Sequence, residues 1–262
     1  MDLHIRGRRA IVNGASAGMG KAAAMALARE GAHVVISARG EARLLAAAEE
    51  IRAETGVDVT PIAADHATDA GRARILAACP APDILIGTCS PPPMTPDYRA
   101  IDDAQWRTSL ETGLMSPVRF MQAVLGGMVE RRWGRIVNIA SIATKFPLEL
   151  RILSGAPRAA LTNFAVAVAP RVIASNVTIN TLLPGMFHTA FTQDQLTARA
   201  RDAGTTYDEE VRKFVESFHI PAQRFGDAAD VGAMAAFLCS EHASYMTGQS
   251  IVIDGATTRS TF

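Results

Sequence analysis

Short, unbroken apolar runs alternate with helix-like segments along most of the chain. The strand-like runs cover 8–14, 32–39, 57–65, 83–90, 134–141, 176–185 and 250–255. Because these runs are apolar throughout rather than at every second position, both faces of the predicted strands must be covered. Parallel strands between two helix layers meet that requirement, and right-handed crossovers then wind the sheet in both directions. The sequence predicts an α/β fold: a doubly wound parallel sheet (Rossmann fold) of about seven strands.

Helix-like segments separate the strands. They cover 21–31, 40–55, 103–132, 151–175, 190–217 and 227–240. The first ends at Gly31 and the second is followed by Gly56, the residue type favoured after a helix C-terminus. Pro117 predicts a bend in the third segment, and Pro170 predicts a bend or an earlier end of the fourth. The proline cluster at 90–96 is typical of a loop, not of a linker, so residues 1–262 are predicted to form one domain.

Composition argues against several function classes. The chain has 26 Lys and Arg and 26 Asp and Glu, so its zero net charge disfavours nucleic-acid binding. The N-terminus lacks the apolar core of a signal peptide, and no run of about 18 uncharged apolar residues predicts a membrane span. Three cysteines without CxxC spacing are expected as reduced thiols in a cytoplasmic protein, and no metal site is predicted.

A glycine-rich turn joins the first predicted strand to the first helix in "NGASAGMG", residues 13–20. Residues without a Cβ permit a tight turn and a close approach of the backbone to phosphate. The helix N-terminus adds free N–H groups and partial positive charge, and a strand before and a helix after are the context that supports dinucleotide binding. The predicted phosphate-binding residues are Gly14, Ser16, Ala17, Gly18, Met19 and Gly20.

The ends of the second and third strands are expected to meet the adenosine half of the nucleotide. The second strand ends in Ser37, Ala38 and Arg39. A carboxylate there would accept hydrogen bonds from a ribose 2′-hydroxyl, whereas a guanidinium suits a 2′-phosphate. NADP(H) is therefore favoured over NAD(H), although a solvated arginine at a helix start is the alternative. Asp65, which ends the third strand, is predicted to meet the adenine, although an N-cap or an ordinary loop residue is the alternative, and His66 beside it is also a predicted cofactor-binding residue.

The motifs together resemble the short-chain dehydrogenase/reductase family over essentially the full length. The resemblance rests on "NGASAGMG", "IVNIAS", "NVTINTLLPGMFHT" and the C-terminal third from "IPAQRFGDAADV" to "IVIDG". It implies contacts of Pro184, Gly185 and Thr189 with the nicotinamide half. It also implies a substrate lid at about 187–220 and a homo-oligomer, either a tetramer or a dimer. Within and beside the lid, Met186, Phe187, Phe191 and Phe218 are candidates for an apolar pocket lining.

The family's catalytic residues are Asn, Ser, Tyr and Lys, and the resemblance implies that this chain keeps one of these four. Ser141 stands at the serine position, whereas Ser154 and Arg158 stand where Tyr and Lys are usual, and Gly113 where Asn is usual. A serine hydroxyl is a poor general acid because its pKa lies far above neutral. Ser141 and Ser154 can still polarise a carbonyl, and Arg158 can hold the cofactor ribose.

A proton donor is then needed from elsewhere. Lys145, His188 and Tyr98 are the candidates, and each could instead be an ordinary loop residue. A product that takes its proton from water needs none of them.

Three functions stay open at this point. The first is an NADP-dependent oxidoreductase acting on a carbonyl or an alcohol of a small-molecule substrate with a non-standard site. The second is a nucleotide-binding protein or sensor without redox turnover. The third is a non-redox lyase or dehalogenase, because halohydrin dehalogenases resemble this fold and use Ser, Tyr and Arg at these spacings.

Overall fold

In the computed structural model, residues 1–261 are described, and of Ala190 and Phe191 only the backbone is described. These residues form a seven-stranded parallel sheet with the order β3-β2-β1-β4-β5-β6-β7. The strands are β1 (Arg9–Asn13), β2 (His33–Ala38), β3 (Val59–Ala63), β4 (Ile84–Gly87), β5 (Gly134–Ile139), β6 (Val177–Pro184) and β7 (Ser250–Ile253). The predicted doubly wound α/β sheet is confirmed.

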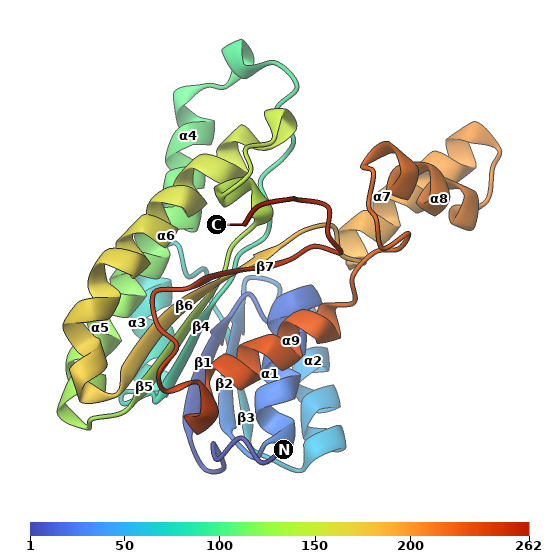
Figure 1. Ribbon diagram of the computed structural model, residues 1–262. Coiled ribbons are helices and arrows are strands. Elements are labelled where there is room, and N and C mark those ends of the chain that lie inside the picture. Colours follow the sequence, from blue (N-terminus) through green and yellow to red (C-terminus); the bar gives the residue numbers. More distant parts are fainter. Residues whose placement is uncertain (262) are drawn as a thin grey trace.

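Helices cover both faces of the sheet (Figure 1). One layer contains α1 (Gly18–Arg29), α2 (Glu41–Thr55) and α9 (Ala228–Leu238). The other contains α3 (Asp69–Ala78), α4 (Asp103–Leu110), α5 (Ser116–Glu130) and α6 (Ile152–Val172). Successive side chains of β4 lie on opposite faces of the sheet. Ile84 and Ile86 belong to the hydrophobic core beneath α1 and α9, and Leu85 belongs to the core beneath α5 and α6. This two-sided burial explains the unbroken apolar runs.

Three helical features differ from the sequence predictions. Helix α3 was not among the predicted helices, and Thr68 caps it by accepting a hydrogen bond from the Gly71 amide. The segment 103–132 is two helices, α4 and α5, joined by a π-helical turn at Glu111–Met115. The distortion therefore precedes Pro117, which lies in the first turn of α5. Helix α6 continues through Pro170 to Val172.

Helix α6 is also the one stretch among the described residues that could span a membrane by length and composition, over Glu149–Ser175. Half of its most apolar window is buried inside the protein. Its buried residues, Leu161, Ala165 and Ala169 among them, pack against the sheet beside α5. This burial is typical of a core helix, so the composition of α6 reflects its place in the helix layer.

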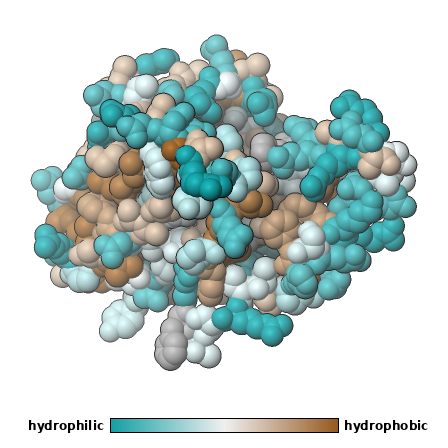
Figure 2. Space-filling model, turned by 90° about the horizontal axis from the view of Figure 1, so that it is seen from above, coloured by the Kyte–Doolittle hydropathy of each residue, from teal (hydrophilic) through white to brown (hydrophobic). Residues whose placement is uncertain are grey.

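A pair of helices, α7 (Ala190–Ala203) and α8 (Tyr207–Ser217), stands away from the sheet (Figure 1). The pair carries mainly hydrophilic surface in the view from above (Figure 2). Thr189 caps α7, Gly204 ends it in the left-handed conformation, and Thr206 begins α8 with a capping box. The pair therefore follows β6 at the end of the sheet where the parallel strands finish, which is also where ligands bind in such folds.

Candidate active site

A groove of about 360 Å³ runs along the carboxyl ends of β1, β2 and β4. Its lining includes most of the residues predicted to bind a nucleotide: Gly14, Ser16, Ala17, Gly18, Met19, Gly20, Arg39, Asp65, His66 and Thr189. Gly40 and Arg43, at the start of α2, and Thr112 also line it. Ser37 does not line the groove. It is fully buried, and its hydroxyl donates a 2.8 Å hydrogen bond to Asn13 Oδ1 beneath the groove floor.

Two glycines of the groove permit close backbone packing that a Cβ would prevent. Gly14 has φ +69°, and a Cβ added there would lie 2.7 Å from the Thr88 carbonyl oxygen. A Cβ on Gly20 would lie 2.3 Å from the Gly14 carbonyl oxygen. Ala17 provides no side-chain cap for α1, and its first turn carries no acidic residue. Free amides and uncompensated partial positive charge therefore face the groove, which fits a dinucleotide pyrophosphate.

His66 has a defined tautomer at the groove edge. The Ser116 hydroxyl donates to the His66 carbonyl oxygen at 2.7 Å, and Ser116 Oγ also lies 2.8 Å from His66 Nδ1. A serine hydroxyl has one proton to donate, so Nδ1 must carry the proton of the second bond. Burial lowers the pKa of His66 below its ordinary value of 6.5, and the nearby Asp65 carboxylate opposes this shift.

His66 therefore contributes to a pH dependence of stability. Because its folded-state pKa is depressed, the unfolded chain binds the proton more readily, and stability is lost as pH falls below about 6.5. The variant His66→Asn keeps an amide donor near the Nδ1 position but does not titrate. We expect it to lose less unfolding free energy than the parent between pH ~7.5 and ~5, measured by urea denaturation. The matched control is His33→Asn at an exposed histidine; equal slopes for parent and His66→Asn would contradict the prediction.

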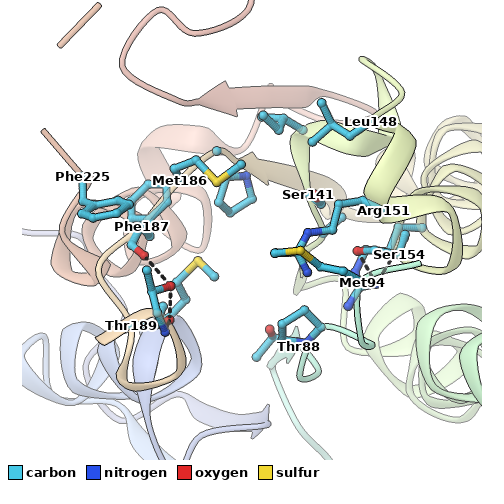
Figure 3. Close-up of a pocket in the computed structure, with 18 of the residues that line it drawn as sticks. Thr88, Met94, Ser141, Leu148, Arg151, Ser154, Met186, Phe187, Thr189 and Phe225 are labelled. Atoms are coloured by element: carbon cyan, nitrogen blue, oxygen red, sulfur yellow. Dashed lines mark hydrogen bonds between the residues drawn. The ribbon is translucent and has the colours of Figure 1, made fainter. Parts of the chain in front are cut away.

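A second cavity adjoins the groove and lies beneath the α7–α8 pair. Met186, Phe187, Thr189 and Phe225 lie on one side of it, and Ser141, Leu148, Arg151 and Ser154 on the other (Figure 3). Pro184, Gly185 and Arg158 also line it. Their predicted contacts with the nicotinamide half and the ribose stay predictions. Met19, Thr88, Cys89 and Thr189 line both spaces, so a molecule in the groove and one in the cavity would meet.

Helix α6 brings Ser154 and Arg158 together at the cavity wall. Both side chains are buried, with 4% exposure each. Arg158 Nη1 donates to Ser154 Oγ at 3.0 Å and to the Ser154 carbonyl oxygen at 3.2 Å, and Nη2 donates to Cys89 Sγ at 3.0 Å. Ser141, at the end of β5, accepts a 3.2 Å hydrogen bond from the Ala143 amide. Each serine oxygen therefore accepts an N–H donor, which leaves its own proton for a ligand in the cavity.

Gly113 faces this wall from the π-helical turn. A Cβ there would lie 3.0 Å from Pro157 Cβ and 3.9 Å from Arg158 Nη1. A larger residue at 113 would press against the helix that carries Arg158. The small residue at 113 and the large ones at 157 and 158 thus fit one another sterically.

The three candidate proton donors lie outside the cavity lining. Lys145 is exposed, with its Nζ 5.9 Å from the centre of the Phe146 ring. Tyr98 is 70% exposed. His188 is exposed and bonds through Nε2 to the Tyr207 hydroxyl at 2.6 Å, a contact within the α7–α8 region. Of the four predicted apolar residues, Met186 and Phe187 line the cavity, and Phe218 stacks on Phe214, which does. The Phe191 side chain lies outside the described residues.

The sequence predictions missed Arg151, Arg43 and Cys89. Arg151 precedes Arg158 by seven residues, which is two helical turns, so both fall on one face of a helix. Arg43 follows Arg39 by four residues at the start of α2 and shares the groove with it. Helical spacing from Arg158 was therefore a usable signal for Arg151, whereas Arg39 lies outside α2, so spacing gave no such signal for Arg43. Cys89 follows the fourth strand, and only the position of α6 relative to that strand shows its contact with Arg158.

Comparison with known proteins agrees with this geometry. A family model described as Enoyl-(Acyl carrier protein) reductase matches residues 14–258. The uncharacterized oxidoreductase YvaG of Bacillus subtilis is 30% identical over the full length of both chains. The 3-oxoacyl-[acyl-carrier-protein] reductase FabG of Vibrio harveyi is 30% identical, over 97% of this chain and 98% of that protein. The L-sorbose reductase of Gluconobacter frateurii, solved with NADPH and L-sorbose, is 30% identical with a TM-score of 0.94, over 99% of this chain and all of that one. The chain therefore belongs to the short-chain dehydrogenase/reductase family of NAD(P)-dependent oxidoreductases.

Proposed function

We propose that this protein is an NADPH-dependent reductase of a small carbonyl compound, with Ser141, Ser154 and Arg158 in a non-standard catalytic site. The observation that carries the proposal is the 3.0 Å hydrogen bond from Arg158 Nη1 to Ser154 Oγ in the wall of a cavity that adjoins the nucleotide groove. When bound, NADPH supplies the hydride that converts the carbonyl to an alcohol. The cavity volume of about 140 Å³ fits a small substrate.

The chain's own groups bind and polarise the carbonyl oxygen. Ser141 and Ser154 each have a hydroxyl proton to donate to it, because their oxygens already accept N–H donors. Arg158 strengthens the Ser154 donor and stabilises the negative charge that develops on the oxygen as the hydride arrives. Arginine keeps its proton, so it cannot act as the acid. With Lys145, His188 and Tyr98 outside the cavity lining, the alkoxide takes its proton from water.

Two arginines in the nucleotide groove would distinguish NADPH from NADH. Arg39 and Arg43 both line the groove at the end of β2, and neither has an ion-pair partner among the residues that the structure describes. Two guanidinium groups that are not held in ion pairs suit a ribose 2′-phosphate. Relatives support this choice, since the L-sorbose reductase structure contains NADPH.

Removing one of these two arginine charges is expected to weaken the binding of NADPH more than the binding of NADH. Arg39→Gln deletes a charge-assisted contact worth ~1.5–3 kcal/mol, which corresponds to roughly 10- to 100-fold weaker NADPH binding. The affinity for NADH, which lacks the phosphate, stays within about twofold. Titration of nicotinamide fluorescence measures both, and Arg74→Gln, an exposed arginine of α3 outside the groove, is the control. Equal losses for the two nucleotides would contradict the assignment.

The function itself is tested by titrating the protein with NADPH and NADH and then following NADPH consumption over a panel of carbonyl compounds. The expected result is tight NADPH binding and consumption that the double variant Ser141→Ala/Arg158→Ala abolishes. Tight binding with no consumption across the panel would identify a nucleotide-binding protein without turnover. Conversion of a substrate without any nucleotide would identify lyase or dehalogenase chemistry.

We further propose that the chain forms a homo-oligomer, a tetramer or a dimer, and that 187–220 acts as a substrate lid. Val166 on α6 is 44% exposed, an apolar residue left uncovered on the outer helix layer. The α7–α8 pair borders the cavity through Thr192, Gln195 and Phe214. Light scattering coupled to size-exclusion chromatography determines the number of subunits.

A further inference from the structure

Two guanidinium groups, one just before α6 and one on it, line the substrate cavity. Arg151 closes the 3₁₀ turn at Glu149–Arg151 that leads into α6, and Arg158 lies seven residues further on. Both line the cavity, with Ser154 between them. Arg151 and Ser154 lie on the same wall, across the cavity from Met186 and Phe187 (Figure 3).

Neither arginine has an anionic partner among the described residues. The hydrogen bonds of Arg158 go to neutral acceptors, the Ser154 oxygens and the Cys89 sulfur. Arg151 Nη1 is buried and has no hydrogen-bond partner. Within the described part of the chain, the cavity lining contains no aspartate and no glutamate. The wall around the two arginines is therefore positively charged without compensation.

Arg151 is half-buried, and its buried Nη1 without a hydrogen-bond partner is costly to the free protein. A charged group removed from water and left without a hydrogen bond loses its hydration and gains nothing in return. Burial, and then the positive charge of Arg158, lower the pKa of Arg151 below its ordinary value. An anionic ligand would relieve both effects at once, because it would accept hydrogen bonds from Arg151 and screen the repulsion between the two cations.

The nucleotide phosphates do not account for this charge. Neither Arg151 nor Arg158 lines the groove where the α1 N-terminus, Arg39 and Arg43 lie. Met94 and Leu148 give apolar surface on the Arg151 side of the cavity, and Met186 gives apolar surface across from it (Figure 3). A ligand that reaches Arg151 would therefore place an anionic end against the guanidinium and a short carbon chain against these side chains.

We propose that the substrate of this reductase carries an oxyanion group, a carboxylate or a phosphate, that binds Arg151 while its carbonyl oxygen lies at Ser141 and Ser154. The proposal rests on the function proposed above, since it names the substrate class of the same site. Arg151 is then the residue that selects the substrate. Arg158 interacts with both groups of the substrate: its charge attracts the oxyanion, and its hydrogen bond to Ser154 supports binding of the carbonyl oxygen.

Binding is tested first, without turnover. Calorimetric titrations of the protein, with and without NADPH, use three probes that cannot be reduced at this site: succinate, methylphosphonate and the neutral succinamide. At least one of the two anions is expected to bind, whereas succinamide is not. Tighter binding of succinate would indicate a carboxylate site, and tighter binding of methylphosphonate would indicate a phosphate site. Arg151→Met is expected to weaken the binding of that anion at least ~10-fold. Arg74→Met, an exposed arginine outside the cavity, is the matched control, and Arg151→Lys is expected to restore part of the affinity.

Turnover then separates the two proposals. The substrate pairs are 4-oxopentanoate with its methyl ester, and hydroxyacetone phosphate with hydroxyacetone. A kcat/KM for one anionic member at least ~10-fold above its neutral partner, lost in Arg151→Met, supports both proposals. NADPH consumption that is as fast with the neutral members supports the reductase and overturns the oxyanion site. Anion binding that depends on Arg151, with no NADPH consumption by any compound, supports the site and overturns the reductase. If no anion binds and no compound is reduced, both proposals are overturned.

Discussion

Replacing Arg158 with methionine lowers kcat/KM for carbonyl reduction by roughly 10²–10³-fold, the loss expected when a preorganised donor to a developing oxyanion is removed. The methionine side chain is flexible and apolar like the stem of arginine, but it is shorter and donates no hydrogen bond. Ser154 Oγ loses the donor at 3.0 Å, so its own proton is no longer directed to the substrate. Steady-state kinetics of NADPH consumption measures the effect, and most of the loss is expected in kcat.

The conservative variant Arg158→Lys distinguishes this role from a structural one. An ammonium retains the charge and one donor toward Ser154 but cannot span Ser154 and Cys89 at once. We expect it to recover part of kcat, whereas a purely structural role would leave both variants with parent kinetics once they are folded. Retention of activity within tenfold in folded Arg158→Met would refute the role of Arg158.

The second large effect concerns the glycine turn. In Gly20→Ala the new methyl group would lie 2.3 Å from the Gly14 carbonyl oxygen and 2.9 Å from Thr88 Cγ2. Because the first of these atoms is backbone, the turn must move to relieve the clash, and overpacking of this kind costs ~1–3 kcal/mol. We expect NADPH binding to weaken by about 10- to 100-fold, as measured by titration of nicotinamide fluorescence.

The matched control is another glycine-to-alanine change in a helix. A Cβ on Gly126 of α5 meets no atom within 4 Å. Gly126→Ala is expected to leave NADPH affinity unchanged and to raise the unfolding free energy by up to ~1 kcal/mol, because alanine favours the helix. If Gly20→Ala bound NADPH as tightly as Gly126→Ala, the close contact between Gly14 and Gly20 would not shape the cofactor site.

The sheet was predictable because its strands are buried on both faces, and continuous apolar runs record that burial directly. Elements that depend on tertiary contacts were harder to predict. In α3, Gly71 lies in the first turn, where a Cβ would meet the Asp65 carbonyl oxygen at 1.9 Å. A glycine required by this close approach weakens the local helix pattern. The π-helical turn at Glu111–Met115 likewise accompanies the packing of Gly113 against Pro157, a contact between distant segments.

The groove was predictable to a similar extent, since a glycine motif between a strand and a helix specifies its own geometry. Ser37 was the exception, because its distance from the strand end does not show that its hydroxyl turns inward to Asn13. In the substrate cavity, Ser154 and Arg158 could be located by spacing from Ser141. Their hydrogen bonds, and the unpaired state of Arg151, depend on which groups the fold brings to the same wall and which it keeps away.

The chain has no net charge, yet the cavity that contains Ser141 and Ser154 holds two arginines and no carboxylate among the described lining residues. At a distance, the charges of the two signs largely cancel, so the protein as a whole exerts little long-range attraction on an anion. The local field acts within the cavity, where surrounding protein shields it from dissolved ions. Added salt would then change the encounter rate with an anionic molecule only slightly. Selectivity would be exercised after entry, at the guanidinium groups, rather than during diffusion toward the surface.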